Sequence, residues 1–173
     1  MNYKIRKVEK SDAASLLTLY KKSAAVPEGL ARTPDEISEK YIAEITEKSI
    51  NGGLGIVIEN ADKTLIGALL SFKHDPKVFK HTLGNMTMAV DPAYFGNGFG
   101  KKLFIAFTSE VRQNRPDIAR VELNVRQSNK LGIAIYESVG FKMEGVQKNR
   151  VLDSNGQLAD DTMMAWFNPG FKG

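Results

Sequence analysis

A glycine-rich segment joins an apolar run to an amphipathic helical pattern near the middle of this chain. The apolar run, residues 83–90, stops at an Asp-Pro pair, and residues 96–101 then read Gly-Asn-Gly-Phe-Gly-Lys. From Leu103 onward, apolar residues recur at helical spacing. Backbone N–H groups in the first turn of a helix have no intrahelical partner, and the helix dipole adds about half a positive charge there. The segment therefore predicts a strand, a turn and a helix start that together bind an anion such as phosphate.

Two common nucleotide-binding motifs do not match this segment. A P-loop requires G-x-x-x-x-G-K-[S/T], but Phe95 stands five residues before Gly100, and Lys102 replaces the hydroxyl residue. A dinucleotide fingerprint requires G-x-G-x-x-G, and here the third glycine comes one residue early. The glycines by themselves also fit a turn that merely lets a strand meet a helix, so the rest of the chain has to decide.

Length and composition limit the classes of protein. The 173 residues, 42% of them hydrophobic, suit one core, and we expect residues 1–173 to form a single domain. The net charge is +4, but lysines and arginines are spread out, so no nucleic-acid partner is expected. The absence of cysteine excludes a disulfide framework and a cysteine nucleophile, and no metal site is predicted. Without an apolar signal segment or an 18-residue apolar run, we expect a cytoplasmic protein with no membrane partner.

Hydrophobic periodicity predicts a mixed α/β class with the order β-αα-βββ-α-β-α-ββ. The first helix is expected to begin at Ser11 as N-cap. A second is expected from a capping box, Thr33 to Glu36, with Pro34 at the first helical position, up to about residue 50. The remaining helices are expected at 98–114 and 131–139, and strands at 3–8, 54–59, 64–72, 83–90, 120–126, 141–151 and 158–167.

Two motifs together resemble a known superfamily. Residues 90–103 read V-x-P-x-x-x-G-x-G-x-G-x-x-L, which resembles motif A of the GCN5-related N-acetyltransferases, the GNAT superfamily. Residues 123–141 read L-N-V-x-x-x-N-x-x-x-I-x-x-Y-E-x-x-G-F, which is similar to motif B of the same superfamily. The resemblance covers about residues 3–167. It implies the GNAT fold, a central, mostly antiparallel mixed β-sheet of about seven strands flanked by about four helices.

The resemblance also implies a site for acetyl-CoA as co-substrate. The backbone of residues 88–90 would pair with the pantetheine arm like an added strand, and the glycine turn would hold the pyrophosphate. Tyr136 would lie near the sulfur and act as a general acid for the departing thiolate. Phe95 is a departure, since the family usually has Gln or Arg there. The implied cofactor-binding residues are Met88, Ala89, Val90, Gly96, Asn97, Gly98, Phe99, Gly100, Lys101 and Asn129.

The implied reaction is acetyl transfer to a primary amine by direct attack in a ternary complex, since no cysteine is present to form an acyl-enzyme. Protein N-terminal acetyltransferases with a similar motif B carry Glu where this chain has Asn124, and an amide cannot take a proton. No general base is therefore assigned. Glu122 shares a strand face with Asn124. Other candidates are His74, His81, Glu28 and a chain of water molecules.

We expect the acceptor to be a small-molecule amine or amino-acid analogue. The alternatives are a protein N-terminus or lysine, or a non-catalytic acyl-CoA-binding module. Residues 26–32 and the turn at 153–161 would build the acceptor pocket, with Arg32 available for a carboxylate and Glu28, Asp160 and Asp161 for an ammonium group. A homodimer is left open, because Trp166, Phe167 and Phe171 suit either a partner or their own domain.

Overall fold

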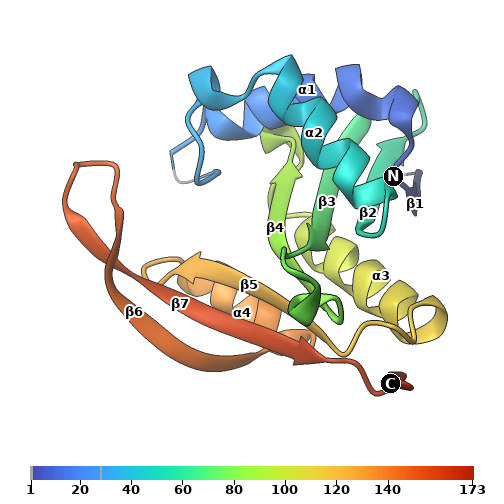
Figure 1. The fold of residues 1–173 in the computed structure, drawn as a ribbon. Helices are drawn as coiled ribbons and strands as arrows, with labels where there is room; N and C mark the ends of the chain where they lie inside the picture. The colour runs from blue at the N-terminus through green and yellow to red at the C-terminus, as the bar shows by residue number, and fades with distance from the viewer. Residues whose placement is uncertain (1, 28) are drawn as a thin grey trace. The chain divides into compact units, whose positions relative to one another are not determined.

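The computed structural model describes residues 2–27 and 29–173 and confirms the expected mixed α/β order (Figure 1). Seven strands form one sheet in the order β1-β2-β3-β4-β5-β7-β6. In chain order the elements are β1 (Tyr3–Lys7), α1 (Ala13–Ala24), α2 (Glu39–Ile50), β2 (Leu54–Asn60), β3 (Leu65–Lys73), β4 (Thr82–Val90), α3 (Phe99–Asn114), β5 (Arg120–Arg126), α4 (Lys130–Ser138), β6 (Lys142–Leu152) and β7 (Leu158–Phe167), with 3-10 turns at Lys10–Asp12, Pro34–Glu36, Lys77–Phe79 and Pro92–Tyr94.

The strand pairing is mostly antiparallel, as expected. β4 pairs with β5 in parallel, whereas β1–β2, β2–β3, β5–β7 and β6–β7 are antiparallel. The chain divides into two compact units, Met1–Phe72 with Thr87–Phe107, and Lys73–Met86 with Thr108–Gly173. The expectation of a single domain stays a prediction.

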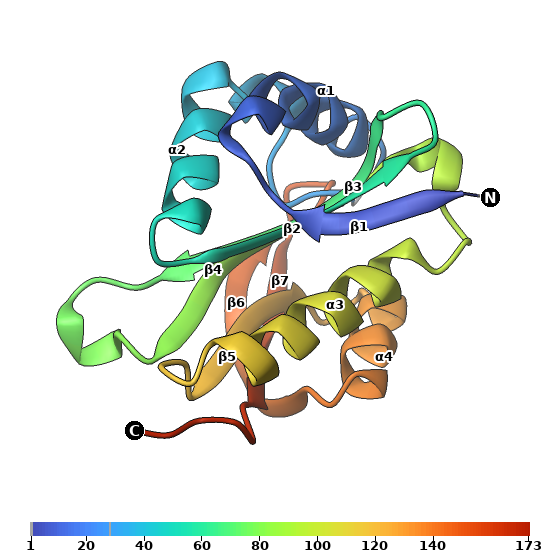
Figure 2. The same cartoon turned by 90° about the vertical axis from the view of Figure 1, so that its right-hand side faces the viewer.

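In the first unit, helices cover both faces of the β1–β2–β3 layer (Figure 2). One core contains side chains of α1 and α2 with alternate residues of the strands, such as Val57 and Leu70. On the opposite face α3 packs closely, since a Cβ added at Gly67 would lie 3.3 Å from Leu103 Cδ1. Because both faces are covered, β2 and β3 are apolar along most of their length rather than alternating.

Both helix starts in this unit differ from the sequence prediction. Ser11 lies inside a 3-10 turn, and α1 begins after Asp12. The capping box at Thr33 and Glu36 is present, but it closes only a 3-10 turn. Ile37 then leaves the helical conformation and is 2% exposed in the core, and α2 restarts after Ser38, whose side chain accepts a hydrogen bond from Tyr41 N. Burial of Ile37 thus outweighs the local helix signal.

In the second unit, β5 separates an apolar face from a polar one. Val121, Leu123 and Val125 are buried, whereas the alternate residues point to the other side and are exposed or half-buried. α4 ends at Ser138 with Val139 as its C-cap, and the predicted Gly140 follows with φ +96°. A Cβ at Gly140 would lie 3.3 Å from Trp166, so this tryptophan packs within its own unit.

In the described part of the chain, no helix is long and apolar enough to cross a membrane. The cytoplasmic location stays a prediction.

The entry to α1 depends on an ion pair that should make stability depend on pH. Arg6 donates two hydrogen bonds of 2.8 Å to the Asp12 carboxylate, which also accepts from Glu9 N. Burial alone would raise the pKa of Asp12, but these hydrogen bonds outweigh it and lower that pKa. A lowered folded-state pKa gives stability that is present above the unfolded value near 3.9 and lost as the pH falls through the folded value.

We therefore predict that Asp12→Asn lowers the free energy of unfolding by about 2 kcal/mol at pH 7, the typical contribution of charged hydrogen bonds. Urea titrations at pH 7 and near pH 2 measure the difference, which should shrink at the lower pH. Asp62→Asn, in an exposed turn, is the control and should change little. A difference that stays constant with pH would show that the charge of Asp12 does not contribute.

Candidate active site

The turn between β4 and α3 is fixed by polar contacts on its approach. The Asp91 carboxylate accepts from Ala93 N at 3.0 Å and pairs with Lys22 Nζ at 2.8 Å. Burial alone would raise the pKa of Asp91, but these two contacts lower it. Asn97 Nδ2 then donates to the carbonyl oxygens of Tyr94 and Phe95 at 3.1 and 3.2 Å. The chain therefore enters the glycine segment along a defined path.

The glycine segment presents its backbone to open space. Gly96 and Gly98 have φ of +78° and +73°, which a residue with a Cβ rarely adopts. Apart from the adjacent residues, no atom of the described chain lies within 4 Å of a Cβ added at either position. In the described part of the chain, the N–H groups of residues 96–101 make no hydrogen bond, and the first bond of α3 is Lys102 N to Gly98 O. Such a run of unpaired donors at a helix start is suited to an anion.

The side chains around this turn differ in their availability. Phe99 is 3% exposed and packs edge-on against Tyr3, so it offers only its backbone. Lys102 Nζ lies 4.6 and 4.8 Å from the ring centres of Tyr3 and Phe99, which holds that ammonium by cation–π contact. Lys101 is exposed. Phe95, at 51% exposure, presents an aromatic surface beside the turn.

The motif B residues lie in the second unit. Asn129 is the N-cap of α4, and its Oδ1 accepts from Gly132 N at 2.8 Å, which leaves Nδ2 as the atom that can donate to a ligand. The ring of Tyr136 lies 6.2 Å from that of Phe141. Burial raises the pKa of Tyr136, which keeps its phenol protonated at neutral pH. A half-buried, protonated phenol is suited to donate a proton.

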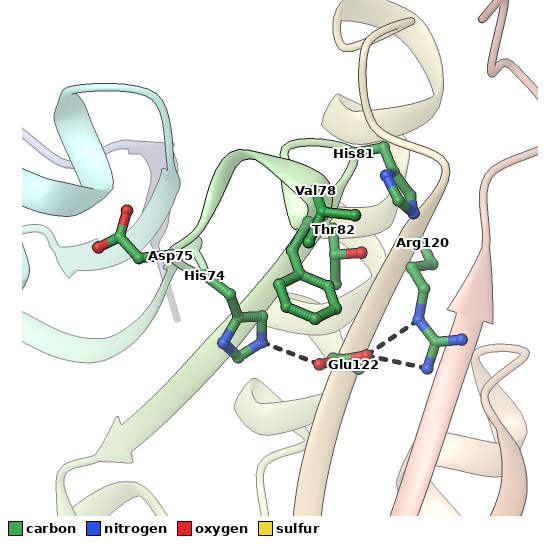
Figure 3. A pocket seen from close by; sticks show the side chains of 8 residues that line it. His74, Asp75, Val78, His81, Thr82, Arg120 and Glu122 are labelled. Carbon is green, nitrogen blue, oxygen red and sulfur yellow. Dashed lines mark hydrogen bonds and ion pairs between the residues drawn. The ribbon is translucent and has the colours of Figure 1, made fainter.

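Among the base candidates, the structure brings together two that are 48 residues apart. Glu122 Oε1 lies 2.8 Å from His74 Nε2, and both line a cavity of about 580 Å³ in the second unit (Figure 3). His81 lines the same cavity. Glu28 lies outside the described residues. Sequence reasoning placed Glu122 on the correct face of β5 but gave no signal that His74 would meet it.

The expected acceptor residues have varied surroundings. Arg32 stacks on the ring of Tyr41 at 4.3 Å. Asp160 pairs with Lys148 at 2.7 Å and accepts from Asn149 N. Asp160 and Asp161 both lie within β7 rather than in the turn. Burial raises the pKa of Asp161, and nearby arginines only partly offset this. Phe167 and Phe171 are exposed, and the homodimer stays a prediction.

Residues 16–141 match the Acetyltransferase (GNAT) family, so the chain belongs to that family and is an acyltransferase. It is 34% identical to the [ribosomal protein bS18]-alanine N-acetyltransferase of Haemophilus ducreyi over 80 residues. These 80 residues make up 46% of this chain and 54% of that protein. It is 31% identical over 113 residues to the Escherichia coli protein of the same name, covering 65% of this chain and 74% of that one. The first match thus spans only about half of the relative's length.

The fold is shared with solved structures of the same family. The GNAT phosphinothricin acetyltransferase of Sinorhizobium meliloti, in complex with acetyl-CoA, superimposes with a TM-score of 0.82 at 19% identity, over 98% of this chain and 91% of that one. Members of this family use acetyl-CoA. That the open glycine turn of the present chain holds its pyrophosphate stays a prediction. The individual ligand contacts stay predictions.

If the turn holds the pyrophosphate, Gly98→Asp should weaken acetyl-CoA binding at least tenfold, about 1.4 kcal/mol or more. The substitution places a carboxylate and a Cβ where N–H groups face the phosphates. Gly52→Asp is a matched control, because Gly52 also has a left-handed φ, +102°, and open space around it. Isothermal titration calorimetry measures both dissociation constants. Equal binding by the two variants would place the pyrophosphate elsewhere.

Proposed function

We propose that this chain transfers the acetyl group of acetyl-CoA to the N-terminal amino group of a protein. The unpaired N–H groups of residues 96–101, on a turn with open space before it, carry the acetyl-CoA part of this proposal. The acceptor part is supported by the relatives that are [ribosomal protein bS18]-alanine N-acetyltransferases, whose acceptor is a protein.

When bound, acetyl-CoA supplies an acetyl group activated as a thioester. The N–H groups of residues 96–101 would hold its pyrophosphate, aided by the exposed charge of Lys101. The backbone of residues 88–90 would lie along the pantetheine arm, and Asn129 Nδ2 would donate to that arm while Oδ1 remains bonded to Gly132 N. The same side chain would then both begin α4 and contact the ligand.

In the chemical step, the acceptor nitrogen attacks the carbonyl carbon directly. The C–N bond forms, the C–S bond breaks, and Tyr136 donates its phenolic proton to the leaving sulfur. The raised pKa of Tyr136, caused by burial, keeps the proton on the phenol until the sulfur takes it.

A small primary amine is the second candidate acceptor. Asn124 favours it, because this exposed side chain of β5 carries an amide where the similar N-terminal acetyltransferases carry a carboxylate. The acetyl-CoA site and the role of Tyr136 are the same whether the acceptor is a protein N-terminus or a small amine.

Tyr136→Phe should lower kcat by about 100-fold or more while leaving the acetyl-CoA dissociation constant unchanged, since only the proton donor is removed. Thiol release measures turnover, and calorimetry measures binding. Tyr3→Phe, which removes a hydroxyl from a half-exposed residue of β1, is the control and should retain activity. Equal losses of turnover and affinity would contradict the acid role.

The acceptor class is tested with a peptide that begins with alanine and contains one lysine, with the same peptide blocked at its N-terminus, and with a panel of small amines. We expect thiol release with the free peptide, abolished by the block, and mass spectrometry should locate the acetyl group on the α-amine. Faster turnover of a small amine, or acetylation of the lysine in the blocked peptide, would contradict the N-terminal assignment.

A further inference from the structure

The cavity of the second unit contains a carboxylate–histidine pair that is held from both ends (Figure 3). Glu122 Oε1 contacts His74 Nε2 at 2.8 Å. The other oxygen, Oε2, accepts from Arg120 Nε at 2.9 Å, and Arg120 also pairs with Glu144 at 2.6 Å. With its second oxygen held in this way, the carboxylate is fixed in position and orients the imidazole.

The contacts of the imidazole define which nitrogen carries the hydrogen. His74 Nδ1 lies 3.2 Å from Asn85 Nδ2, and an amide nitrogen only donates. Nδ1 therefore has the lone pair, which accepts from this amide, and Nε2 donates its hydrogen to Glu122. In this tautomer Nδ1 is a base, and the carboxylate behind the ring stabilises the imidazolium that forms when Nδ1 takes a proton.

The backbone of β4 is shaped around this ring. A Cβ added at Gly84 would overlap the imidazole of His74, so only glycine allows the ring to lie there. The next residue, Asn85, has φ +46°, a left-handed conformation that costs energy for a residue with a Cβ. The missing Cβ of Gly84 thus makes room for the ring, and the left-handed backbone of Asn85 places its Nδ1 partner.

The pair is accessible from the cavity. The side chains of His74 and Glu122 are 31% and 34% exposed. Phe79, whose ring lies 6.2 Å from that of His74, and Val78 give the cavity an apolar wall. Asp75 points away from the pair (Figure 3). The titratable and charged groups around His74 are Glu122 and Arg120 on β5, Asp75 and His81 in the segment between β3 and β4, and Glu144 on β6 through Arg120.

We propose that His74 is the general base for the acceptor amine and that Glu122 is its positioning residue. The proposal rests on the acetyl transfer proposed above and supplies the proton acceptor that Asn124 cannot provide. Glu122 and Asn124 share one face of β5, about 6.6 Å apart at the usual strand rise, a gap that one or two water molecules span. An ammonium group, or a water molecule bound to it, takes the place of the exposed Asn85 amide at Nδ1.

The protons balance over one turnover. The ammonium group gives one proton to His74 Nδ1, and the free amine forms the C–N bond as the C–S bond breaks. Tyr136 protonates the sulfur, and the second nitrogen proton restores its phenol. The imidazolium releases its proton to water. The sum is ammonium plus acetyl-CoA giving amide, coenzyme A and one proton.

The test compares the two histidines of the chain, since both line the cavity but His74 is the one paired with Glu122. With the alanine-terminated peptide, His74→Gln should lower kcat/KM at least about 100-fold at pH 7, whereas His81→Gln should match the wild type. The acetyl-CoA dissociation constant should not change. The deficit should shrink toward pH 9, because an α-amine with a pKa near 8 then loses its proton unaided.

A second measurement does not depend on turnover. Because the chain has two histidines, nitrogen NMR of labelled imidazoles gives two sets of signals. The set that disappears in His74→Gln should show the hydrogen on Nε2 in the wild type. Glu122→Gln should change that tautomer population, because the carboxylate that accepts from Nε2 is then absent.

Equal rates for His74→Gln and the wild type on the same peptide would overturn the base assignment and leave the proposed acetylation standing. A hydrogen on Nδ1 rather than Nε2 would also overturn it. Absence of turnover by the wild-type protein with every peptide and amine would overturn the proposed function, and the role of His74 with it.

Discussion

Backbone N–H groups that the chain leaves unpaired are the constraint around which the first unit is organised. A buried or desolvated N–H without an acceptor is costly, so residues 96–101 need either water or a ligand. Their arrangement depends on two left-handed glycines, on the Asp91 cap that ends β4, and on packing of α3 against the sheet at Gly67. These contacts fix a curved row of donors before any ligand arrives, which lowers the entropic cost of binding one.

In the second unit, the corresponding constraint is the alternation along β5. One face supplies Val121, Leu123 and Val125 to the core, and the opposite face is thereby left for polar side chains. Arg120 and Glu122 use that face to build an ion-pair network that reaches β6 and the segment before β4. Because one face of β5 is packed in the core, the strand is rigid. It therefore holds the functional groups on its other face more accurately than a loop would.

The order and most boundaries of the elements were predictable, because they depend on local signals. The 158–167 and 120–126 strands were located to the residue, and Gly140 ended its helix as expected. The start of α2 was wrong, because burial of Ile37 interrupts the helix that the capping box begins. A capping box depends only on four neighbouring residues, whereas the position of Ile37 depends on the core in which its side chain is buried.

The sequence by itself determined the family, the glycine turn and the alternation of β5, since each is a pattern within one short segment. Only the tertiary structure decided that Lys102 is held by aromatic rings, that Asn129 Oδ1 begins a helix, and that His74 meets Glu122. These contacts join residues from separate elements, or assign one atom of a side chain to a particular partner. Their geometry depends on a glycine that makes room for an imidazole and on a strained asparagine beside it. No periodicity along the chain predicts the contact between His74 and Glu122, because the space for the imidazole exists only once the strands have packed.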